Sequence, residues 1–426
     1  MKEEKMRVDK RTLKGKRYKK SLYMALSFSI LSLASLWIWD IWNRLPSSIQ
    51  VKIGEEQGLE FCVPATATIY KDQYQQRVNV NLNQELRFYG EREDTYTMQV
   101  ELFGFIPFKE TAVAVVKERM VTPLGYPVGV YVQTDGILVI DTGSFSSFSG
   151  KKVSPAKNIL LPGDYICKVN DENVDSKEDL IEQISHCRGK SIDLEVRREE
   201  QYYKIQVMPS KDKTGEYKLG IWVRDNAQGI GTLTYMDESG NFGALGHGIN
   251  DIDTTKLMEI KKGGLYKTDI ISVTKGYKGS PGELTGVIAY SGRYKLGEIN
   301  QNTKKGVYGS LEEENIQLTE KNIPIALKQE IEKGEAQILC TISTEPELFN
   351  VIITEIHQEN DNINRGLEIK VTDERLLEVT GGIVQGMSGS PIVQNGKLVG
   401  AVTHVLVNDP TRGYGIFIEN MLEAAE

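Results

Sequence analysis

The chain is poor in the residues that most often build metal and redox sites, with only four cysteines and four histidines among 426 residues. The cysteines are widely spaced and form no Cys-x-x-Cys pair, so neither a metal site nor a cofactor is expected. A Walker loop, a dinucleotide fingerprint and internal repeats are also absent from the sequence. Cys167 and Cys187 could form a disulfide in an exported protein, but we expect buried free thiols at all four positions.

Positive charge is concentrated at the start of the chain. Residues 1–20 contain ten Lys or Arg and three Asp or Glu, a local balance of +7. Because the whole chain carries −8, the remaining residues carry −15. A body with this excess of acidic residues is not expected to bind nucleic acid.

An uncharged, mostly apolar run from Ser21 to Trp39 follows the basic segment. At about 1.5 Å of rise per residue, a helix of this length crosses the hydrocarbon core of a bilayer. Trp37, Trp39 and Trp42 cluster at its far end, as in an interfacial aromatic belt. We therefore predict a transmembrane anchor over residues 21–43, a cytoplasmic tail over residues 1–20 and an exported body. A cleaved signal peptide is the alternative.

Residues 44–110 are expected to form a tether and a small β-rich region. Val78–Leu82 and Met98–Leu102 alternate between apolar and polar residues, as half-buried strands do. No chemical motif is recognisable in this stretch.

Residues 111–210 have the element order of a circularly permuted PDZ domain, the type found in bacterial proteases. A turn-rich loop enters a strand, and a helix start is indicated near Asp175 and Ser176. PDZ domains bind a peptide as an added strand and hold its terminal carboxylate in a glycine-rich loop. The predicted peptide-binding loop contains Leu124, Gly125, Tyr126, Val128 and Gly129. In the alternative interpretation the loop only packs and the domain is a spacer.

Residues 211–426 contain many short β-like runs and little amphipathic helix, which predicts a pair of β-barrels or sandwiches. In this region Ser388 stands between glycines, in the run Gly386–Pro391. A nucleophilic serine needs a turn that projects its hydroxyl and points nearby N–H groups at the developing oxyanion. Glycines permit such a backbone, although similar clusters also occur in ordinary turns.

Among the histidines, His247 is the best candidate for a general base. Glycines flank it within Gly243–Ile249 and leave room for a serine and a substrate. His404 lies in a strand-like run, where we expect it to be packed, and is the reserve candidate. His186 is expected at a helix end and His357 on an exposed polar stretch.

A serine, a histidine and an orienting acid together would form a catalytic triad. His247 precedes Ser388, which is the order in chymotrypsin-like double barrels, and Gly386 and Ser388 would then supply the oxyanion-hole N–H groups. The residues alone leave the acid open. The candidates are Asp373, Asp251 and Asp253.

In its anchor and in several glycine-rich motifs, the chain resembles the stage IV sporulation protein B peptidase family. The similarity extends from the anchor to the C-terminus, is tightest over 376–418, and includes Gly243–Ile249, Lys278–Glu283 and Thr380–Ile392. The family pattern places its triad on His247, Asp373 and Ser388. The expected fold is mainly β, with an N-terminal transmembrane helix, a PDZ-like α+β domain at 111–210 and a chymotrypsin-like double β-barrel at 211–426.

The resemblance implies a membrane-anchored serine endopeptidase of sporulation signalling. Members are exported into the space between the two forespore membranes, cut themselves, and clip a regulator of an intramembrane metalloprotease complex. This cleavage leads to sigma factor processing. The expected partners are therefore protein substrates including the chain itself, that regulatory subunit, and the membrane. The alternative is a non-enzymatic adaptor whose PDZ domain docks protein partners at the membrane.

Overall fold

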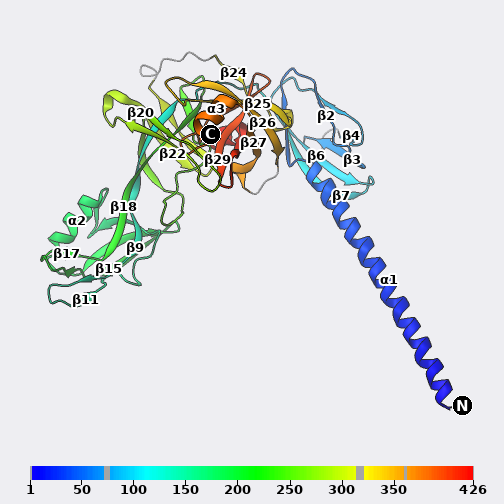
Figure 1. Ribbon diagram of the computed structural model, residues 1–426, viewed down its shortest axis with the longest axis horizontal. Helices are drawn as coiled ribbons and strands as arrows, with labels where there is room; N and C mark the ends of the chain where they lie inside the picture. Colours follow the sequence, from blue (N-terminus) through cyan, green and yellow to red (C-terminus); the bar gives the residue numbers. More distant parts are fainter. Residues whose placement is uncertain (1, 72–76, 313–320, 359–361, 426) are drawn as a thin grey trace. The chain divides into compact units, whose positions relative to one another are not determined.

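The computed structural model describes residues 2–71, 77–312, 321–358 and 362–425. Strands far outnumber helices (Figure 1), so the mainly β fold class is confirmed. The chain divides into two compact units, Met1–Glu118 and Arg119–Glu426.

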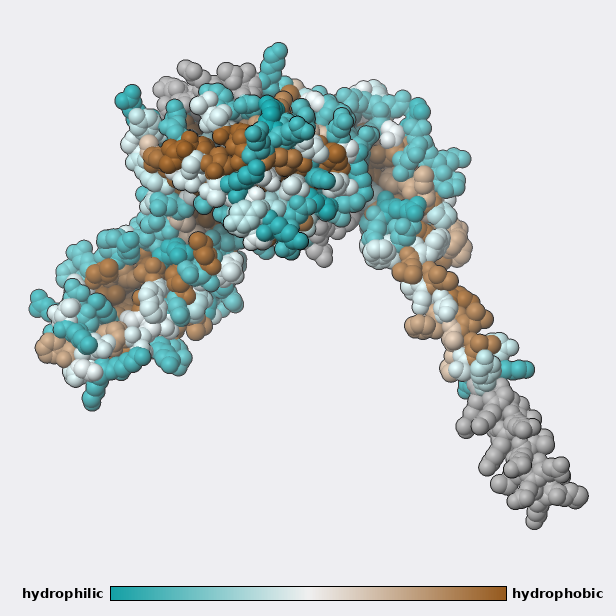
Figure 2. Space-filling view, in the orientation of Figure 1, coloured by the Kyte–Doolittle hydropathy of each residue, from teal (hydrophilic) through white to brown (hydrophobic). Residues whose placement is uncertain are grey.

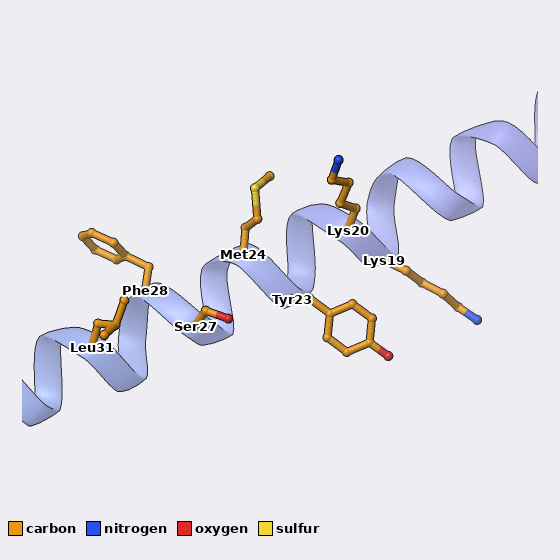
Figure 3. A pocket seen from close by; sticks show the side chains of 7 residues that line it. All are labelled: Lys19, Lys20, Tyr23, Met24, Ser27, Phe28 and Leu31. Carbon is orange, nitrogen blue, oxygen red and sulfur yellow. The ribbon is translucent and has the colours of Figure 1, made fainter.

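The first unit begins with helix α1 (Lys2–Arg44). Its segment Tyr18–Arg44 has a mean hydropathy of 1.7 and is long and apolar enough to cross a membrane. Figure 3 shows the start of this segment, where two lysines are followed by mainly apolar side chains: Lys19, Lys20, Tyr23, Met24, Ser27, Phe28 and Leu31. The predicted anchor therefore lies within one helix.

A small β-module completes the first unit. Its five-stranded sheet has the order β1 (Ser48–Lys52), β7 (Ile106–Val116), β6 (Asp94–Leu102), β3 (Ala65–Tyr70) and β4 (Val78–Asn81), and a ribbon pairs β2 (Gln57–Leu59) with β5 (Leu86–Phe88). The core of the module includes Ile41 and Leu45, which fixes the end of α1 to the sheet. The strands predicted near residues 78–82 and 98–102 are confirmed. The boundary expected at residue 110 falls inside β7.

The second unit contains two closed, six-stranded antiparallel barrels. The first barrel runs through β9 (Pro127–Thr142), β20 (Ile260–Thr274), β22 (Lys295–Thr303), β23 (Gly306–Leu311), β19 (Asn241–Ala244) and β18 (Ile221–Met236), and it closes because β18 also pairs with β9. Alternate apolar residues of β9, such as Val128, Val130 and Val132, point into its core. Two barrels are thus present, but the first takes β9 from residues 127–142, which lie outside the range 211–426 predicted for it and inside the range 111–210 predicted for a PDZ-like domain.

The second barrel runs through β25 (Gly334–Cys340), β26 (Glu347–Ile356), β27 (Leu367–Val371), β30 (Asp409–Phe417), β29 (Lys397–Leu406) and β28 (Pro391–Gln394). Its burial alternates with the strand period. On β26, for example, Phe349, Val351 and Ile353 are buried while their neighbours face outward. Two short helices adjoin it, α3 (Glu374–Thr380) and α4 (Ile418–Ala425).

Strands β9 and β18 are both 16 residues long and continue out of the first barrel into an α+β lobe, residues 136–226. There the end of β9 pairs with β12 (Tyr165–Val169), which is followed in the sheet by β14 (Ile192–Arg198) and β15 (Gln201–Val207). Helix α2 (Lys177–His186) has Ser176 as its N-cap and Asp179 completing a capping box, as the sequence predicted for a helix start there. His186 ends this helix as expected.

Candidate active site

Ser388 lies in the loop between α3 and β28, at the edge of the second barrel. The side chain of the preceding residue, Met387, is fully buried in the core of that barrel. The hydroxyl of Ser390 is also buried and donates a hydrogen bond of 2.7 Å to the Met387 carbonyl. Ser388 is therefore presented by a backbone that is anchored on both sides.

Two threonines of the first barrel hold this loop from the other side of the seam between the barrels. The N–H of Thr232 donates to the Ser388 carbonyl (2.9 Å), and its hydroxyl donates to the Gly386 carbonyl (2.8 Å). The hydroxyl of Thr234 donates to the Gly389 carbonyl (2.7 Å). The seam is close enough at Gly389 that an added Cβ would lie 2.1 Å from the Thr232 carbonyl oxygen, and φ is +98° there. Only glycine fits this position.

The backbone N–H groups around Ser388 divide into engaged and available donors. Those of Gln385, Met387, Gly389 and Ser390 each donate to a protein carbonyl. Those of Gly386 and Ser388 have no acceptor among the described residues. An oxyanion hole needs two such unengaged donors beside the nucleophile. They are the two N–H groups that the sequence predicted for this role.

His247 follows β19 and reaches the same seam from the first barrel. The side-chain amide of Asn364 donates to the Gly246 carbonyl (2.7 Å) and so ties this loop to the second barrel. A Cβ added at Gly246 would lie 3.0 Å from the Thr403 methyl group. Thr403 is also the residue whose carbonyl accepts the hydroxyl of Ser388 (2.8 Å). The structure therefore brings the two predicted residues to one place, without a hydrogen bond between them in this conformation.

The imidazole of His247 is held in the tautomer that a general base requires. Its Nδ1 lies 2.9 Å from the Gly248 carbonyl. A carbonyl only accepts, so Nδ1 must carry the proton, and the lone pair of Nε2 is free to take another. Burial lowers the pKa of His247, and the Gly248 carbonyl opposes this effect. The side chain is thus neutral at physiological pH.

His404 on β29 is the nearest ring to His247, with centroids 5.2 Å apart. It is exposed at the surface of the seam rather than packed as expected. The surrounding protein, the positive charge of a protonated His247 and Arg365 together lower the pKa of His404 to about 4. His404 is therefore neutral as well, and the two rings do not repel each other near pH 7.

Asp373 does not contact His247 in this structure. It is the N-cap of α3, where its carboxylate accepts the Arg375 N–H (3.0 Å) and the Asn350 N–H (3.2 Å). It also forms an ion pair with the Arg375 guanidinium (3.1 Å). Although burial opposes it, the net effect of these contacts is a lowered pKa for Asp373. The placement of the triad acid at Asp373 is therefore not reproduced, because its carboxylate is used locally to begin a helix.

The other two aspartates are occupied in the same way. Asp251 is buried and forms an ion pair with Arg224 on β18, and Asp253 binds the same guanidinium at 2.8 Å. Within the described residues, no carboxylate is hydrogen-bonded to the His247 ring. The group that orients this imidazole is the backbone carbonyl of Gly248, which no side-chain motif could reveal.

The predicted peptide-binding loop lies in the first barrel rather than in the α+β lobe. Leu124 and Val128 are in the barrel core, and Gly129 pairs with β18 on one side and β20 on the other. The N–H of Gly125 donates to the Leu233 carbonyl, and its own carbonyl accepts the Thr341 hydroxyl. Tyr126 accepts from the Leu233 N–H. These backbone groups are already paired, so this loop cannot hold a peptide terminus.

The segment around Gly282 supports the serine loop, a role that was not predicted from the sequence. The segment around Gly282, at the start of β21 (Glu283–Ile288), pairs with the residue just before the oxyanion donors: Gln385 N–H donates to Gly282 (2.9 Å), and Leu284 N–H donates to Gln385 (2.8 Å). The signal was present, since Lys278–Glu283 is one of the motifs that carry the family resemblance. Only the folded structure shows that this segment pairs with the loop that precedes Gly386.

In the part of the chain that the structure describes, no group of three His, Cys, Asp or Glu side chains could hold a metal ion. All four cysteines are free thiols, and Cys62 is exposed rather than buried as expected.

One family model of peptidases matches part of the chain. Residues 215–422 match the family model described as SpoIVB peptidase S55. A solved HtrA-type protease with a bound decapeptide is similar over 70% of this chain and 62% of its own length, with 11% sequence identity and a TM-score of 0.29. The chain thus spans about three fifths of that structure, and at this TM-score the likeness supports no statement about the site.

Proposed function

We propose that the chain is a serine peptidase of the SpoIVB S55 family, whose model matches residues 215–422, with Ser388 as its nucleophile and His247 as its general base. The observation that carries the proposal is their meeting at one seam, with unengaged N–H groups on Gly386 and Ser388. The tautomer set by Gly248 leaves Nε2 as the proton acceptor.

The reaction requires one movement of the serine side chain. Its hydroxyl leaves the Thr403 carbonyl and turns toward Nε2 of His247, since catalytic hydrogen bonds are often completed only in the substrate complex. Nε2 then takes the hydroxyl proton as Oγ attacks the peptide carbonyl. The Gly386 and Ser388 N–H groups stabilise the oxyanion, and His247 returns the proton to the leaving amine. Water releases the acyl group by the same steps.

The substrate backbone can be held on β29. This strand pairs with β28 only as far as Ala401, and Val402 is bonded to the serine loop. Among the described residues its second edge is open from His404 to Leu406, and Val407 then accepts from the Gly279 N–H. An extended substrate added there would lie beside Ser388, because Thr403 is in direct contact with the serine hydroxyl. This arrangement favours cleavage within extended, unfolded segments.

Covalent labelling with a fluorophosphonate tests the nucleophile. The full chain should be labelled at Ser388, and Ser388→Ala should abolish both labelling and self-cleavage while leaving the circular dichroism spectrum unchanged. Labelling at another serine, or self-processing by purified Ser388→Ala protein, would remove Ser388 from the mechanism. An adaptor without activity would not be labelled at all.

For the biological role, we follow the family resemblance. The chain is proposed to be anchored by α1 with a cytoplasmic N-terminus and its body between the forespore membranes, where it cuts itself and clips a regulator of an intramembrane metalloprotease complex. The basic residues before the span support this orientation. Mass spectrometry of the self-processed N-terminus, together with protease protection of the tail, tests both parts.

We also propose that the α+β lobe binds partner peptides in the manner of a PDZ domain. The binding edge would lie in this lobe and not at the loop of residues 124–129. In the lobe, β18 pairs with β9 on one side only, so residues 221–226 are an open strand edge within the described structure. The Lys177 N–H at the start of α2 donates to Asp225 (2.9 Å), which places the helix beside this edge. Trp222→Ala should weaken docking of partner peptides in a binding titration, without loss of fluorophosphonate labelling.

A further inference from the structure

A hairpin of the first unit carries an exposed apolar tip. Strands β6 and β7 pair as far as Leu102 and Ile106, and residues 103–105 form the turn. Phe103 is 61% exposed, Phe105 is 73% exposed and Ile106 is 43% exposed. Phe103 also has a φ of +56°, a left-handed backbone that bulky aromatic residues seldom adopt. A water-facing turn would not favour any of these features.

The hairpin is fixed against the outer end of α1. The ring of Phe103 stacks on Trp37 with centroids 5.9 Å apart, and Phe108 meets Trp42 edge-on at 5.5 Å. The Lys109 ammonium lies over the Trp42 ring at 4.9 Å and donates to the Leu45 carbonyl. With Ile41 and Leu45 in the core of the module, these contacts set the height of the tip along the helix.

That height is inside a bilayer, if α1 is the anchor proposed above. About 20 helical residues cross the hydrocarbon core, and counting from Ser21 they reach Asp40. Asp40 and Arg44 form an ion pair at 2.8 Å, and these charged residues place the end of the hydrocarbon core near Asp40. Trp37 is three residues before Asp40, or about 4.5 Å deeper. A ring stacked on Trp37 must share that depth.

Apolar surface continues over this junction. Figure 2 shows hydrophobic residues along α1 up to the β-module, and the exposed ones at its outer end include Trp39 at 66% and Trp42 at 46%. The tip therefore adds to an apolar belt that already exists on the helix. Aromatic residues are favoured at this level of a membrane, where one face is apolar and the other is wet.

We propose that the β6–β7 tip, Phe103 to Ile106, is a second membrane contact that enters the outer leaflet of the bilayer crossed by α1. The occupant is the lipid surface itself, because the stacked pair Trp37–Phe103 gives the tip and the helix one depth. Two contacts hold the module at a fixed tilt on the membrane, which a single helix does not do. The proposal rests on α1 spanning the membrane, and the test separates the two.

Depth-dependent quenching tests the contact. Cysteines are introduced singly at Phe105, at Leu31 in the span and at Val78, in a full chain whose four native cysteines are replaced by alanine. Each is labelled with the NBD fluorophore and reconstituted in vesicles of phosphatidylcholine and phosphatidylglycerol, with or without brominated acyl chains. Val78 is the matched control, since it is an exposed apolar residue (52%) of the same module whose strand partner Ile69 lies far along the sheet from the tip. An unchanged circular dichroism spectrum confirms that each protein is folded, whether or not it is an active peptidase.

The expected result is strong quenching at positions 31 and 105 and none at 78, with bromines near the headgroup most effective for position 105. Quenching at 31 with position 105 behaving like 78 would overturn the hairpin contact and leave the anchor intact. No quenching at 31 would overturn the anchor and the hairpin contact together. If the Phe105 variant does not fold, Ile106→Cys gives the same measurement.

Discussion

The two barrels have the same number of strands and the same antiparallel pairing, but they contribute differently to the site. The second barrel is self-contained, and its core holds Met387 directly under Ser388. The first barrel shares its two longest strands, β9 and β18, with the α+β lobe, and it carries His247 in the segment between β19 and β20. Thr232 and Thr234 of β18 then bind the serine loop. In the proposed mechanism, one barrel therefore holds the nucleophile rigidly, and the other provides the base and the connection to the α+β lobe.

The largest effect is expected when either the serine of the second barrel or the histidine of the first barrel is removed alone. Ser388→Ala and His247→Ala should each reduce self-cleavage by at least about 10⁴-fold, because the serine and its base act as a unit. The double variant should be no worse than the single ones. Rates are measured with purified full-length protein, and His404→Gln serves as the control, with a loss of less than about tenfold. A His404 variant as inactive as His247→Ala would reassign the base.

The seam itself can be tested at Gly389. Gly389→Ala should reduce the rate about 100-fold or more, because the new Cβ meets the Thr232 carbonyl at 2.1 Å and forces the barrels apart. Gly396→Ala is the matched control: its φ is +75°, also left-handed, but an added Cβ has nothing within 4 Å. In that variant we expect only the cost of a strained backbone and no clash. Equal activity in the two variants would mean that the close approach at the seam is unimportant.

Asp373 distinguishes an orienting acid from a helix cap. A triad aspartate changed to asparagine costs about 10⁴-fold, whereas asparagine is a good N-cap. We expect Asp373→Asn to lose less than about tenfold. The acid limb of kcat/KM should remain below pH 6.5 in both proteins, since burial lowers the pKa of His247 and keeps the base neutral to lower pH. Glu347→Gln, which removes the other carboxylate bound to Arg375, controls for the ion pair. A 10⁴-fold loss would show that Asp373 reaches His247 in the assembled state.

The smallest expected effect is on stability, in α4 beside the second barrel. Burial raises the pKa of Glu419 to about 7 from a usual value of 4.5, although the Lys328 N–H opposes this. The folded chain therefore keeps a proton that the unfolded chain releases, and stability falls by at most about 3 kcal/mol as the pH rises from 4.5 to 7. Glu419→Gln should remove this loss in urea unfolding at pH 5 and pH 8. Glu374→Gln, which changes an exposed carboxylate at the start of α3, should not change it, and an unchanged pH dependence in Glu419→Gln would contradict the assignment.

Local signals in the sequence were sufficient for local structure. The N-cap-like residues Asp175 and Ser176 predicted the start of α2, and alternation predicted strands in the first module. The glycines around Ser388 predicted a turn with two unengaged N–H groups. In each case the residues that decide the structure are neighbours in the chain. The prediction of a peptide-binding loop was wrong because it depended on residues that are distant in the chain. The strand at Val128 was recognisable from the sequence, but the sheet that it joins was not.

By itself, the sequence determined an apolar N-terminal helix, a mainly β body, and a serine and a histidine that can each stand in an open, glycine-framed turn. Only the tertiary structure decided that barrel closure through β9 and β18 brings the two turns together, that Gly248 rather than an aspartate orients the imidazole, and that Phe103 lies against Trp37. The physical reason is that turn geometry depends on a few adjacent residues. Contacts across a seam depend instead on how whole sheets close and pack, which no single segment specifies.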